Sequence, residues 1–230
     1  MTHTLDNRCI LLFVRFPERG KVKSRLAREM NEDFVLRLYE SMVMDTIDML
    51  KRTKIPFRIC FDPPDKLTQL KQWLGQEHTY MPQCGIDIGD RMEKAFMQVF
   101  LEEVKEILLV GSDIPGLTTT VIGEAFAALS SHDVVIGPAN DGGYYMIGFQ
   151  KNTFSPGIFH NMTWSTDRVY PETVTRLLDE ERSMYIVREC IDIDTREDLI
   201  KVLLAAPDWQ KTTAVRTLRL LRNYTKSITG

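Results

Sequence analysis

The chain has 230 residues, of which 43% are hydrophobic and 27% are charged, and its formal net charge is -3. These values are typical of a single large α/β domain with a well-buried core, and they exclude the disordered and fibrous classes of protein. A net charge this small gives no overall field that would attract nucleic acid, so any anion must bind at a local group of basic residues.

The amino-terminal residues have neither the basic region nor the apolar core of a signal peptide. No apolar run approaches the length of a membrane span, so we expect a cytoplasmic protein without a transmembrane segment. The cysteines and histidines are scattered and show no paired spacing, which favours reduced thiols over disulfides or a zinc site.

A basic loop follows the first predicted strand. An apolar run over residues 9–14 predicts the strand, and Pro17 and Gly20 break regular structure in the loop over residues 15–25. Ser24 can cap the helix that follows, whose amino end would favour anions. We interpret the loop as a site for a diphosphate or triphosphate, and a solvated basic loop is the alternative. Its basic residues are Arg15, Arg19, Lys21, Lys23 and Arg25.

Strands and helices alternate after this loop, which is typical of parallel sheet units. Residues 32–52 have the apolar spacing of an amphipathic helix, residues 57–61 form a short strand, and residues 66–74 form another helix. The next loop ends in Asp90 and Arg91, which we expect beside the nucleotide. A helix cap would explain Asp90 without any ligand.

The central motif is the sequence Gly-Ser-Asp that follows the apolar run over residues 107–110. Asp113 would emerge, after Gly111 and Ser112, at the carboxyl edge of a parallel sheet, where open α/β sheets bind their ligands. A carboxylate in this position can hold a hard divalent cation across a diphosphate. Asp is also common in turns and helix caps, and that interpretation stays open here.

A second acidic loop follows the strand predicted over residues 134–136. Asp141 could bind sugar hydroxyls, contact a metal or take a proton, and the pair Gly142-Gly143 before Tyr144 lets the backbone approach a ligand closely. The alternative is a hairpin turn, for which Asp-Gly is the commonest signal. Trp164 could stack on a sugar or base, or it could be a half-buried loop residue.

The last motif places Asp192 and Asp194 on one side of an extended segment, before Thr195, which can cap a helix. These carboxylates could be further metal ligands, or one of them could cap the helix. From Pro207 the composition becomes basic, with a short amphipathic helix for which docking on the domain is favoured over partner or membrane contact. We therefore expect a catalytic domain over residues 1–205 and a basic helical tail over residues 206–230.

These motifs together resemble a bacterial family of GT-A-type nucleotide-diphospho-sugar transferases, some of whose members are labelled glycosyltransferases of arsenosugar biosynthesis. The resemblance covers about residues 8–203 and implies a three-layer α/β/α Rossmann-like GT-A fold with a mixed, mostly parallel central sheet. It also implies that Asp113 takes the place of the final Asp of the GT-A metal-binding motif. Arg15 stands where many members have lysine, and Ile114 where many have cysteine.

The resemblance also assigns residues to the nucleotide, with Lys21, Lys23 and Arg25 on its phosphates. The expected metal is Mg²⁺ or Mn²⁺, held by Asp113 with Asp192 and Asp194 as further ligands. Asp113 and Asp141 are the expected catalytic residues, Asp141 as a general base if the reaction inverts the anomeric carbon. The expected nucleotide- and substrate-binding residues are Arg15, Pro17, Gly20, Lys21, Lys23, Arg25, Asp90, Arg91, Gly111, Ser112, Gly142, Gly143, Tyr144 and Trp164.

The function that we expect is metal-dependent transfer of a glycosyl group from a nucleotide-diphospho-sugar to a small-molecule acceptor. The basic loop and the Asp-Ile-Asp-Thr motif also resemble guanylyltransferases that activate phospholactate, so a nucleotidyltransferase that releases pyrophosphate is the first alternative. A non-catalytic nucleotide-binding subunit is the second. The sequence leaves a homodimer open.

Overall fold

The computed structural model describes residues 7–205 and 214–229. The strands are β1 (Arg8–Arg15), β2 (Phe57–Asp62), β3 (Thr79–Pro82), β4 (Glu106–Gly111), β5 (Val134–Pro138), β6 (Tyr144–Gln150) and β7 (Met184–Ile186). The α-helices are α1 (Ser24–Glu29), α2 (Glu32–Thr53), α3 (Leu67–Leu74), α4 (Ile88–Phe100), α5 (Thr119–Leu129), α6 (Val169–Asp179), α7 (Arg196–Ala205) and α8 (Val215–Thr229). Two short 3-10 helices are η1 (Pro64–Lys66) and η2 (Pro156–Phe159).

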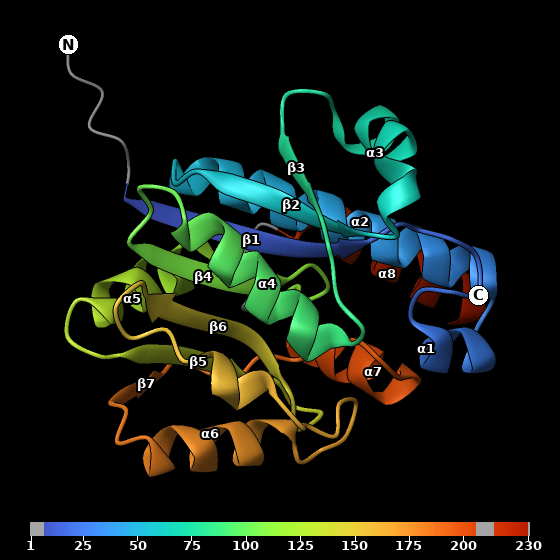
Figure 1. The fold of residues 1–230 in the computed structure, drawn as a ribbon. Helices are drawn as coiled ribbons and strands as arrows, with labels where there is room; N and C mark the ends of the chain where they lie inside the picture. Colours follow the sequence, from blue (N-terminus) through green and yellow to red (C-terminus); the bar gives the residue numbers. More distant parts are fainter. Residues whose placement is uncertain (1–6, 206–213, 230) are drawn as a thin grey trace.

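A single sheet of seven strands crosses the molecule in the order β3-β2-β1-β4-β6-β5-β7 (Figure 1). Strand β6 is antiparallel to both of its neighbours, whereas the other paired strands are parallel. The expectation of a mixed, mostly parallel sheet is therefore confirmed. Because β1, β2, β3 and β4 run in the same direction, the segments that follow them meet at one edge of the sheet, near α1 and α7 in Figure 1.

Helices cover both faces of the sheet, which explains why β1 is apolar along almost its whole length. Successive side chains of a strand point to opposite faces. Leu12 accordingly packs in the cluster formed with α2, α5 and α8, whereas Leu11 packs in the cluster formed with α4 and α6. Both leucines are fully buried. This arrangement confirms the three-layer α/β/α fold (Figure 1).

Helix α2 provides the scaffold that its apolar stripe predicts. Asn31 caps the helix, because its Oδ1 atom accepts hydrogen bonds from the backbone of Asp33 at 3.0 Å and of Phe34 at 3.1 Å. One residue of the helix also reaches the carboxyl edge of the sheet. The Tyr39 hydroxyl donates to the Arg15 carbonyl at 3.0 Å and accepts from the Arg15 N–H at 2.9 Å. Tyr39 thereby fixes the end of β1.

Two helix starts differ from the sequence prediction. Lys23, and not Ser24, is the residue before α1, and no side chain caps that helix. Asp87, and not Asp90, caps α4, because its Oδ1 atom accepts a hydrogen bond from the Asp90 N–H at 2.8 Å. Asp90 in turn accepts from the Ile86 N–H at 3.0 Å. Both helices begin within three residues of the expected cap, which is the usual error of boundaries inferred from residue type alone.

The amphipathic helix α8 docks on α2. Asp45 of α2 caps the first turn of α8, because its Oδ2 atom accepts hydrogen bonds from the Thr217 N–H at 2.9 Å and from the Thr217 hydroxyl at 2.8 Å. Near the other end, Tyr224 stacks on Phe34 with ring centroids 4.0 Å apart. Docking of the helix is therefore observed. Residues 206–213 lie outside the described residues. They follow the expected domain boundary after residue 205 and include the basic residue Lys211. The division into two parts therefore stays a prediction.

Among the helices of the described residues, none combines the length and the apolar character needed to cross a membrane.

Candidate active site

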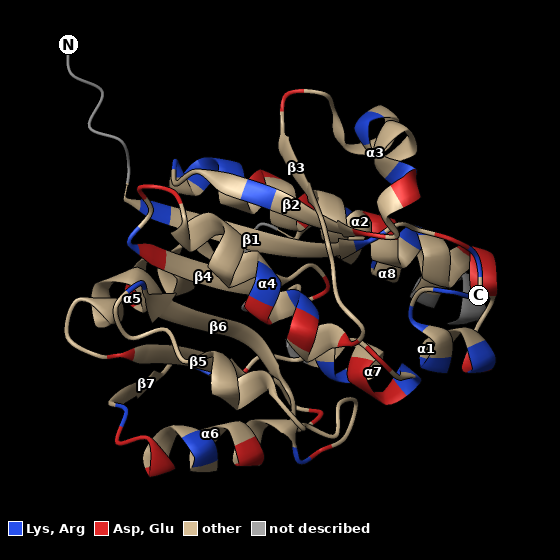
Figure 2. Cartoon of the chain, in the orientation of Figure 1, with Lys and Arg blue, Asp and Glu red and all other residues tan. Residues whose placement is uncertain are grey.

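A cavity of about 730 Å³ opens at the carboxyl edge of the sheet. Its lining comes from the ends of β1, β2 and β4, from the loop after β1 with the start of α1, and from residues 165–167. Charged residues gather around α1, α7 and the first turns of α4 beside this edge, whereas the strands are mostly uncharged (Figure 2). The lining residues include Arg15, Lys21, Lys23, Arg25, Tyr39, Asp62, Gln83, Arg91, Gly111, Ser112, Asp113, Asp141 and Asp194.

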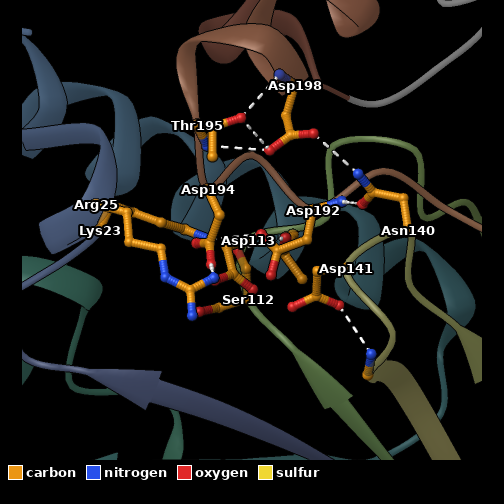
Figure 3. A network of polar contacts seen from close by, with 12 residues as sticks. Lys23, Arg25, Ser112, Asp113, Asn140, Asp141, Asp192, Asp194, Thr195 and Asp198 are labelled. Carbon is orange, nitrogen blue, oxygen red and sulfur yellow. Dashed lines mark hydrogen bonds and ion pairs between the residues drawn. The ribbon is translucent and has the colours of Figure 1, made fainter. Parts of the chain in front are cut away.

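Lys23 lies at the centre of the site. Its ammonium group is 2.7 Å from Asp113 Oδ2 and donates to Asp194 Oδ1 at 2.9 Å and to Asp192 Oδ1 in a shorter hydrogen bond (Figure 3). Its side chain is only 5% exposed. The residue adopts the left-handed conformation, with φ 47° and ψ 48°, at the point where the basic loop turns into α1. The loop therefore delivers one buried cation to three carboxylates from distant parts of the chain.

Two separate segments deliver these carboxylates. Asp113 lies two residues beyond the end of β4, and Asp192 and Asp194 alternate along the extended segment before α7. Asn140 holds that segment to the loop after β5, because its Oδ1 atom accepts from the Asp192 N–H at 2.8 Å and its Nδ2 atom donates to Asp198 Oδ1 at 2.9 Å (Figure 3). The spacing Asp-x-Asp thus places both carboxylates on one side, as the sequence predicts.

Asp141 joins the same group of acids. One carboxylate oxygen from each of Asp141, Asp192 and Asp194 can lie within 4.8 Å of the other two, a spacing that could hold a metal ion. Asp141 also stabilises the loop between the antiparallel strands β5 and β6, because its Oδ1 atom accepts from the Gly143 N–H at 2.9 Å. The hairpin interpretation of this loop is therefore correct for the backbone, and it leaves the second carboxylate oxygen of Asp141 available to the site.

Gly142 is required by the close approach of two loops. Its φ is +86°, and a Cβ atom there would lie 2.4 Å from the backbone of Asp167. The Tyr170 N–H also donates to the Gly142 carbonyl at 2.8 Å. Gly142 thus lets the loop after β5 pack directly against the segment that leads into α6.

The group of side chains around Lys23 carries more negative than positive charge. Four carboxylates face Lys23 and Arg25, whose Nη1 atom is 3.7 Å from Asp194 Oδ2. Burial alone would lower the pKa of Lys23, but attraction to Asp113, Asp192 and Asp194 outweighs it, and the pKa is raised well above its ordinary value. Burial and then repulsion from Asp113 raise the pKa of Asp192 to about 8, despite the attraction of Lys23. The excess of anions therefore favours an additional cation.

Comparison with known proteins places the chain in a family. Residues 46–166 match the family described as an uncharacterized protein conserved in bacteria, DUF2064. The chain belongs to the DUF2064 family. A search of curated proteins found no match.

Solved structures relate this DUF2064 protein to transferases that act on nucleotides. It is similar to a proposed nucleotide-diphospho-sugar transferase from Desulfovibrio desulfuricans G20, with 34% identity and a TM-score of 0.89 over 96% of this chain and 99% of that one. The expected GT-A-like family is therefore confirmed.

More distant structures share the fold alone. One is 4-diphosphocytidyl-2C-methyl-D-erythritolsynthase from Anaerococcus prevotii DSM 20548, with 13% identity and a TM-score of 0.57 over 90% of this chain and 100% of that one. Another is a manganese complex of Rv0371C from Mycobacterium tuberculosis H37Rv, with 14% identity and a TM-score of 0.51 over 86% and 98% of the two chains. The fold therefore occurs both in a proposed nucleotide-diphospho-sugar transferase and in 4-diphosphocytidyl-2C-methyl-D-erythritolsynthase.

The acids of the DUF2064 protein fit a hard divalent cation. Asp113, Asp141, Asp192 and Asp194 offer only oxygen atoms, the ligands that Mg²⁺ and Mn²⁺ prefer. The ammonium of Lys23 lies among three of these acids, so the geometry of the cluster already accommodates a positive charge. Asp141, Asp192 and Asp194, whose carboxylate oxygens lie within 4.8 Å of one another, could therefore hold a divalent cation.

Other expected binding residues divide between the cavity and its supporting walls. Arg91 lines the cavity and pairs with Asp62 at 3.2 Å, and Lys21 lines it while pairing with Glu18 at 2.5 Å. Tyr144 is instead half-buried against the core, where its hydroxyl lies 3.9 Å from Met92 Sδ and burial raises its pKa. Eight expected site residues are not among those that line the cavity, namely Pro17, Gly20, Asp90, Gly142, Gly143, Tyr144, Trp164 and the expected metal ligand Asp192.

Trp164 and Asp90 show what these supporting residues do. The Trp164 ring covers Gly89 in the first turn of α4, where a Cβ atom would lie 2.3 Å from the ring. Asp90 pairs with Lys94 at 2.7 Å. Both residues lie outside the cavity lining and stabilise the wall formed by α4.

The sequence prediction missed several residues of the cavity. Asp62 ends β2 and could have been found by the same rule as Asp113, because it is an acid at the carboxyl end of a parallel strand. Tyr39 had no such signal, because it belongs to the buried face of an amphipathic helix. Gln83 follows β3, and its side-chain amide donates to the Cys60 carbonyl at 2.7 Å.

Proposed function

We propose that this DUF2064 protein is a metal-dependent glycosyltransferase, which transfers a glycosyl group from a nucleotide-diphospho-sugar to a small-molecule acceptor. The observation that carries the proposal is the convergence of Asp113, Asp192 and Asp194 on Lys23, beside the cavity that the cations of the basic loop line. The 34% identical protein from Desulfovibrio desulfuricans supports the same class of donor.

The residues of the basic loop would bind the diphosphate. Arg25 and Lys21 line the cavity, and their side chains are 56% and 66% exposed, so both can reach a ligand in it. Arg15 lines the same cavity from the end of β1, which Tyr39 fixes. Fixed cations of this kind stabilise the charge that develops on a nucleoside-diphosphate leaving group, and they need no rearrangement during the reaction.

The acids would hold the metal and orient the acceptor. Asp113 would be the principal ligand of Mg²⁺ or Mn²⁺, with Asp192 and Asp194 as further ligands. When bound, the metal supplies positive charge that stabilises the diphosphate as it leaves. Asp141 projects from the opposite loop and would take the proton of an acceptor hydroxyl if the reaction inverts the anomeric carbon.

A nucleotidyltransferase is the second candidate, because the fold also occurs in 4-diphosphocytidyl-2C-methyl-D-erythritolsynthase. In that case a phosphorylated acceptor would attack the α-phosphorus of a nucleoside triphosphate, and pyrophosphate would leave. The cavity and its cations suit either phosphate chain.

Identification of the ligand and the leaving group tests both candidates. Nucleotides and nucleotide-sugars are first screened by thermal shift with and without Mn²⁺, because a ligand of the native state raises its melting temperature. The ligands that bind are then incubated with candidate acceptors, and the products are analysed. We expect release of a nucleoside diphosphate. Pyrophosphate release would replace the proposal with the second candidate, and binding without any turnover would favour a non-catalytic nucleotide-binding subunit.

A further inference from the structure

The position of Lys23 conflicts with a simple role as a phosphate ligand. An ammonium group has three N–H donors, and three carboxylates occupy all three of them in this structure. A lysine that binds phosphate would need at least one donor directed at the ligand. Lys23 must therefore release at least one aspartate before it can contact a diphosphate.

The same three aspartates are the metal ligands of the proposed function. The Lys23 ammonium contacts all three of these acids, so it lies where a metal shared by them would have to lie. Two positive charges cannot share one set of carboxylate oxygens without strong repulsion. Lysine and metal are therefore competitors for one position.

The side chain can leave this position without a change in the fold. The backbone around Lys23 is anchored by the buried side chains of Val22 and Leu26, on either side of it in the chain. A lysine side chain ends in a point charge on a flexible four-carbon stem, so rotation about its own bonds is enough to redirect it. Lys23 also lines the cavity, so the ammonium has a polar space into which it can turn.

We propose that the Lys23 ammonium occupies the metal position in the metal-free protein, where it neutralises the aspartates. When a divalent ion binds in this position, the Lys23 side chain turns and contacts the diphosphate. The inference rests on the proposed function, because it uses the same metal ligands. It adds an order of events: metal alone binds weakly, since it must expel the lysine, whereas metal and diphosphate bind together strongly. Such coupling is reciprocal, so each ligand raises the affinity for the other.

The competition between Lys23 and the metal is tested directly by titrating the full chain with Mn²⁺ alone. Electron paramagnetic resonance measures the concentration of the free ion at each step. Lys23→Met removes the competing charge and retains an apolar chain of similar length. We expect Lys23→Met to bind Mn²⁺ at least about tenfold more tightly than the wild type, the factor that corresponds to about 1.4 kcal/mol. The matched control is Lys51→Met, which removes an exposed lysine that pairs with Glu77 at 3.2 Å, and its affinity should equal that of the wild type.

Wild-type or weaker affinity in folded Lys23→Met would overturn the inference and leave the proposed function standing. If neither protein binds Mn²⁺, both the inference and the metal-dependent function are wrong. Failure of glycosyl transfer with any donor would leave the Mn²⁺ measurement unaffected, so the two failures are distinguishable.

A measurement on the wild-type protein keeps the test decisive if Lys23→Met does not fold. Lysines are labelled briefly with an amine-reactive reagent, and the extent of modification at each position is read by mass spectrometry. Labelling of Lys23 should be slow in the metal-free protein and should increase severalfold with saturating Mn²⁺, whereas labelling of Lys51 should not change. Labelling of Lys23 that stays constant or decreases with Mn²⁺ would contradict the displacement.

Discussion

Two regions of the molecule join acidic and basic side chains that are far apart in the sequence, and they do so in opposite proportions. In the first, which we call the Lys23 cluster, one ammonium serves the carboxylates of Asp113, Asp192 and Asp194. In the second, which we call the Asp45 cap, one carboxylate accepts four hydrogen bonds from the first turn of α8. The Lys23 cluster has more acceptor groups than donor groups, whereas in the Asp45 cap both oxygens of the one acceptor group already accept hydrogen bonds.

The Asp45 cap shows what a purely structural acid looks like in this protein. Asp45 is 4% exposed, and the four donors to it are two backbone N–H groups, the Thr217 hydroxyl and the Arg216 guanidinium. A buried carboxylate that is satisfied in this way stabilises a fold and has no free lone pair for a ligand. The Lys23 cluster, by contrast, faces a cavity and keeps more negative than positive charge. The balance of donors and acceptors therefore separates a structural acid from a candidate functional one.

Helix α2 connects the two regions. Asp45 caps α8, and the next residue, Thr46, has its hydroxyl 3.3 Å from the carbonyl of Ser112, next to Asp113. A small cavity lies between α2, Ile114 and Thr217. The tail helix is thus packed beneath the loop that carries Asp113, and its docking supports that loop without entering the cavity.

The largest effect is expected for Asp113→Asn, which removes one negative charge from the Lys23 cluster and keeps the shape of the side chain. We expect transfer to fall by at least about a hundredfold, because loss of one contact that stabilises the leaving group costs roughly 3 kcal/mol in barrier. The melting temperature should change little, since Lys23 keeps two carboxylate partners. Initial rates and thermal melts, with the exposed Asp65→Asn as control, measure both quantities. Near wild-type activity would remove Asp113 from the mechanism.

The reverse pattern is expected for Asp45→Ala, which breaks the Asp45 cap. The substitution leaves the buried N–H and hydroxyl of Thr217 without their acceptor, so the free energy of unfolding should decrease by about 2 kcal/mol. The affinity for Mn²⁺ should equal that of the wild type, because Asp45 is not part of the Lys23 cluster. Urea denaturation and Mn²⁺ titration test the two halves of the prediction. A large loss of Mn²⁺ affinity in the folded variant would show that the regions are coupled more strongly than their contacts indicate.

The sequence predicts the Lys23 cluster better than the Asp45 cap, and the reason is physical. Asp113 lies at the end of a strand, and parallel strands bring their carboxyl ends to one edge, so the topology alone places it near the basic loop. Asp45 lies inside a helix and carries no such signal. Its partner Thr217 is 172 positions away and is fixed only by how α8 packs.

Local capping was harder to predict than the fold. Ser24 and Asp90 were expected caps because of their residue type, yet Asp87 caps α4 and no side chain caps α1. The start of α1 is displaced because Lys23 takes a left-handed conformation there, next to the long-range contacts that its side chain makes with the aspartates. That Lys23 binds phosphate stays a prediction; its ammonium lies among three carboxylates in the structure, a contact that no local pattern encodes.

The pH dependence of stability offers a third distinction between the regions. Burial and repulsion from Asp113 raise the pKa of Asp192 to about 8 in the folded protein, above its ordinary value of 3.8. The folded state therefore holds a proton that the unfolded chain releases. The associated stability is complete below pH 3.8 and is lost as the pH rises through about 8.

We expect the metal-free protein to become less stable between about pH 6 and about pH 8, with a slope of at most about 1.4 kcal/mol per pH unit. Urea denaturation across this range measures the slope. In Asp192→Asn the slope should decrease, because the amide imitates the protonated acid at every pH. An equal slope in the wild type and in Asp192→Asn would assign the pH dependence to groups other than Asp192.

The smallest effect is expected for Asp48→Ala. This variant separates the contribution of the ion pair with Arg216 from that of the buried hydrogen bonds in the Asp45 cap. Arg216 pairs with both acids, at 3.1 Å from Asp45 and 2.6 Å from Asp48, so distance alone would rank Asp48 as the stronger partner. The Asp48 side chain is 34% exposed, however, and water replaces most of what an exposed ion pair contributes. We therefore expect Asp48→Ala to lower the free energy of unfolding by only about 0.5 kcal/mol, a fraction of the loss in Asp45→Ala. Urea denaturation of both variants compares them directly. Equal losses would mean that attraction to Arg216 holds α8 in place, whereas the expected inequality would assign that role to the buried hydrogen bonds from Thr217 to Asp45.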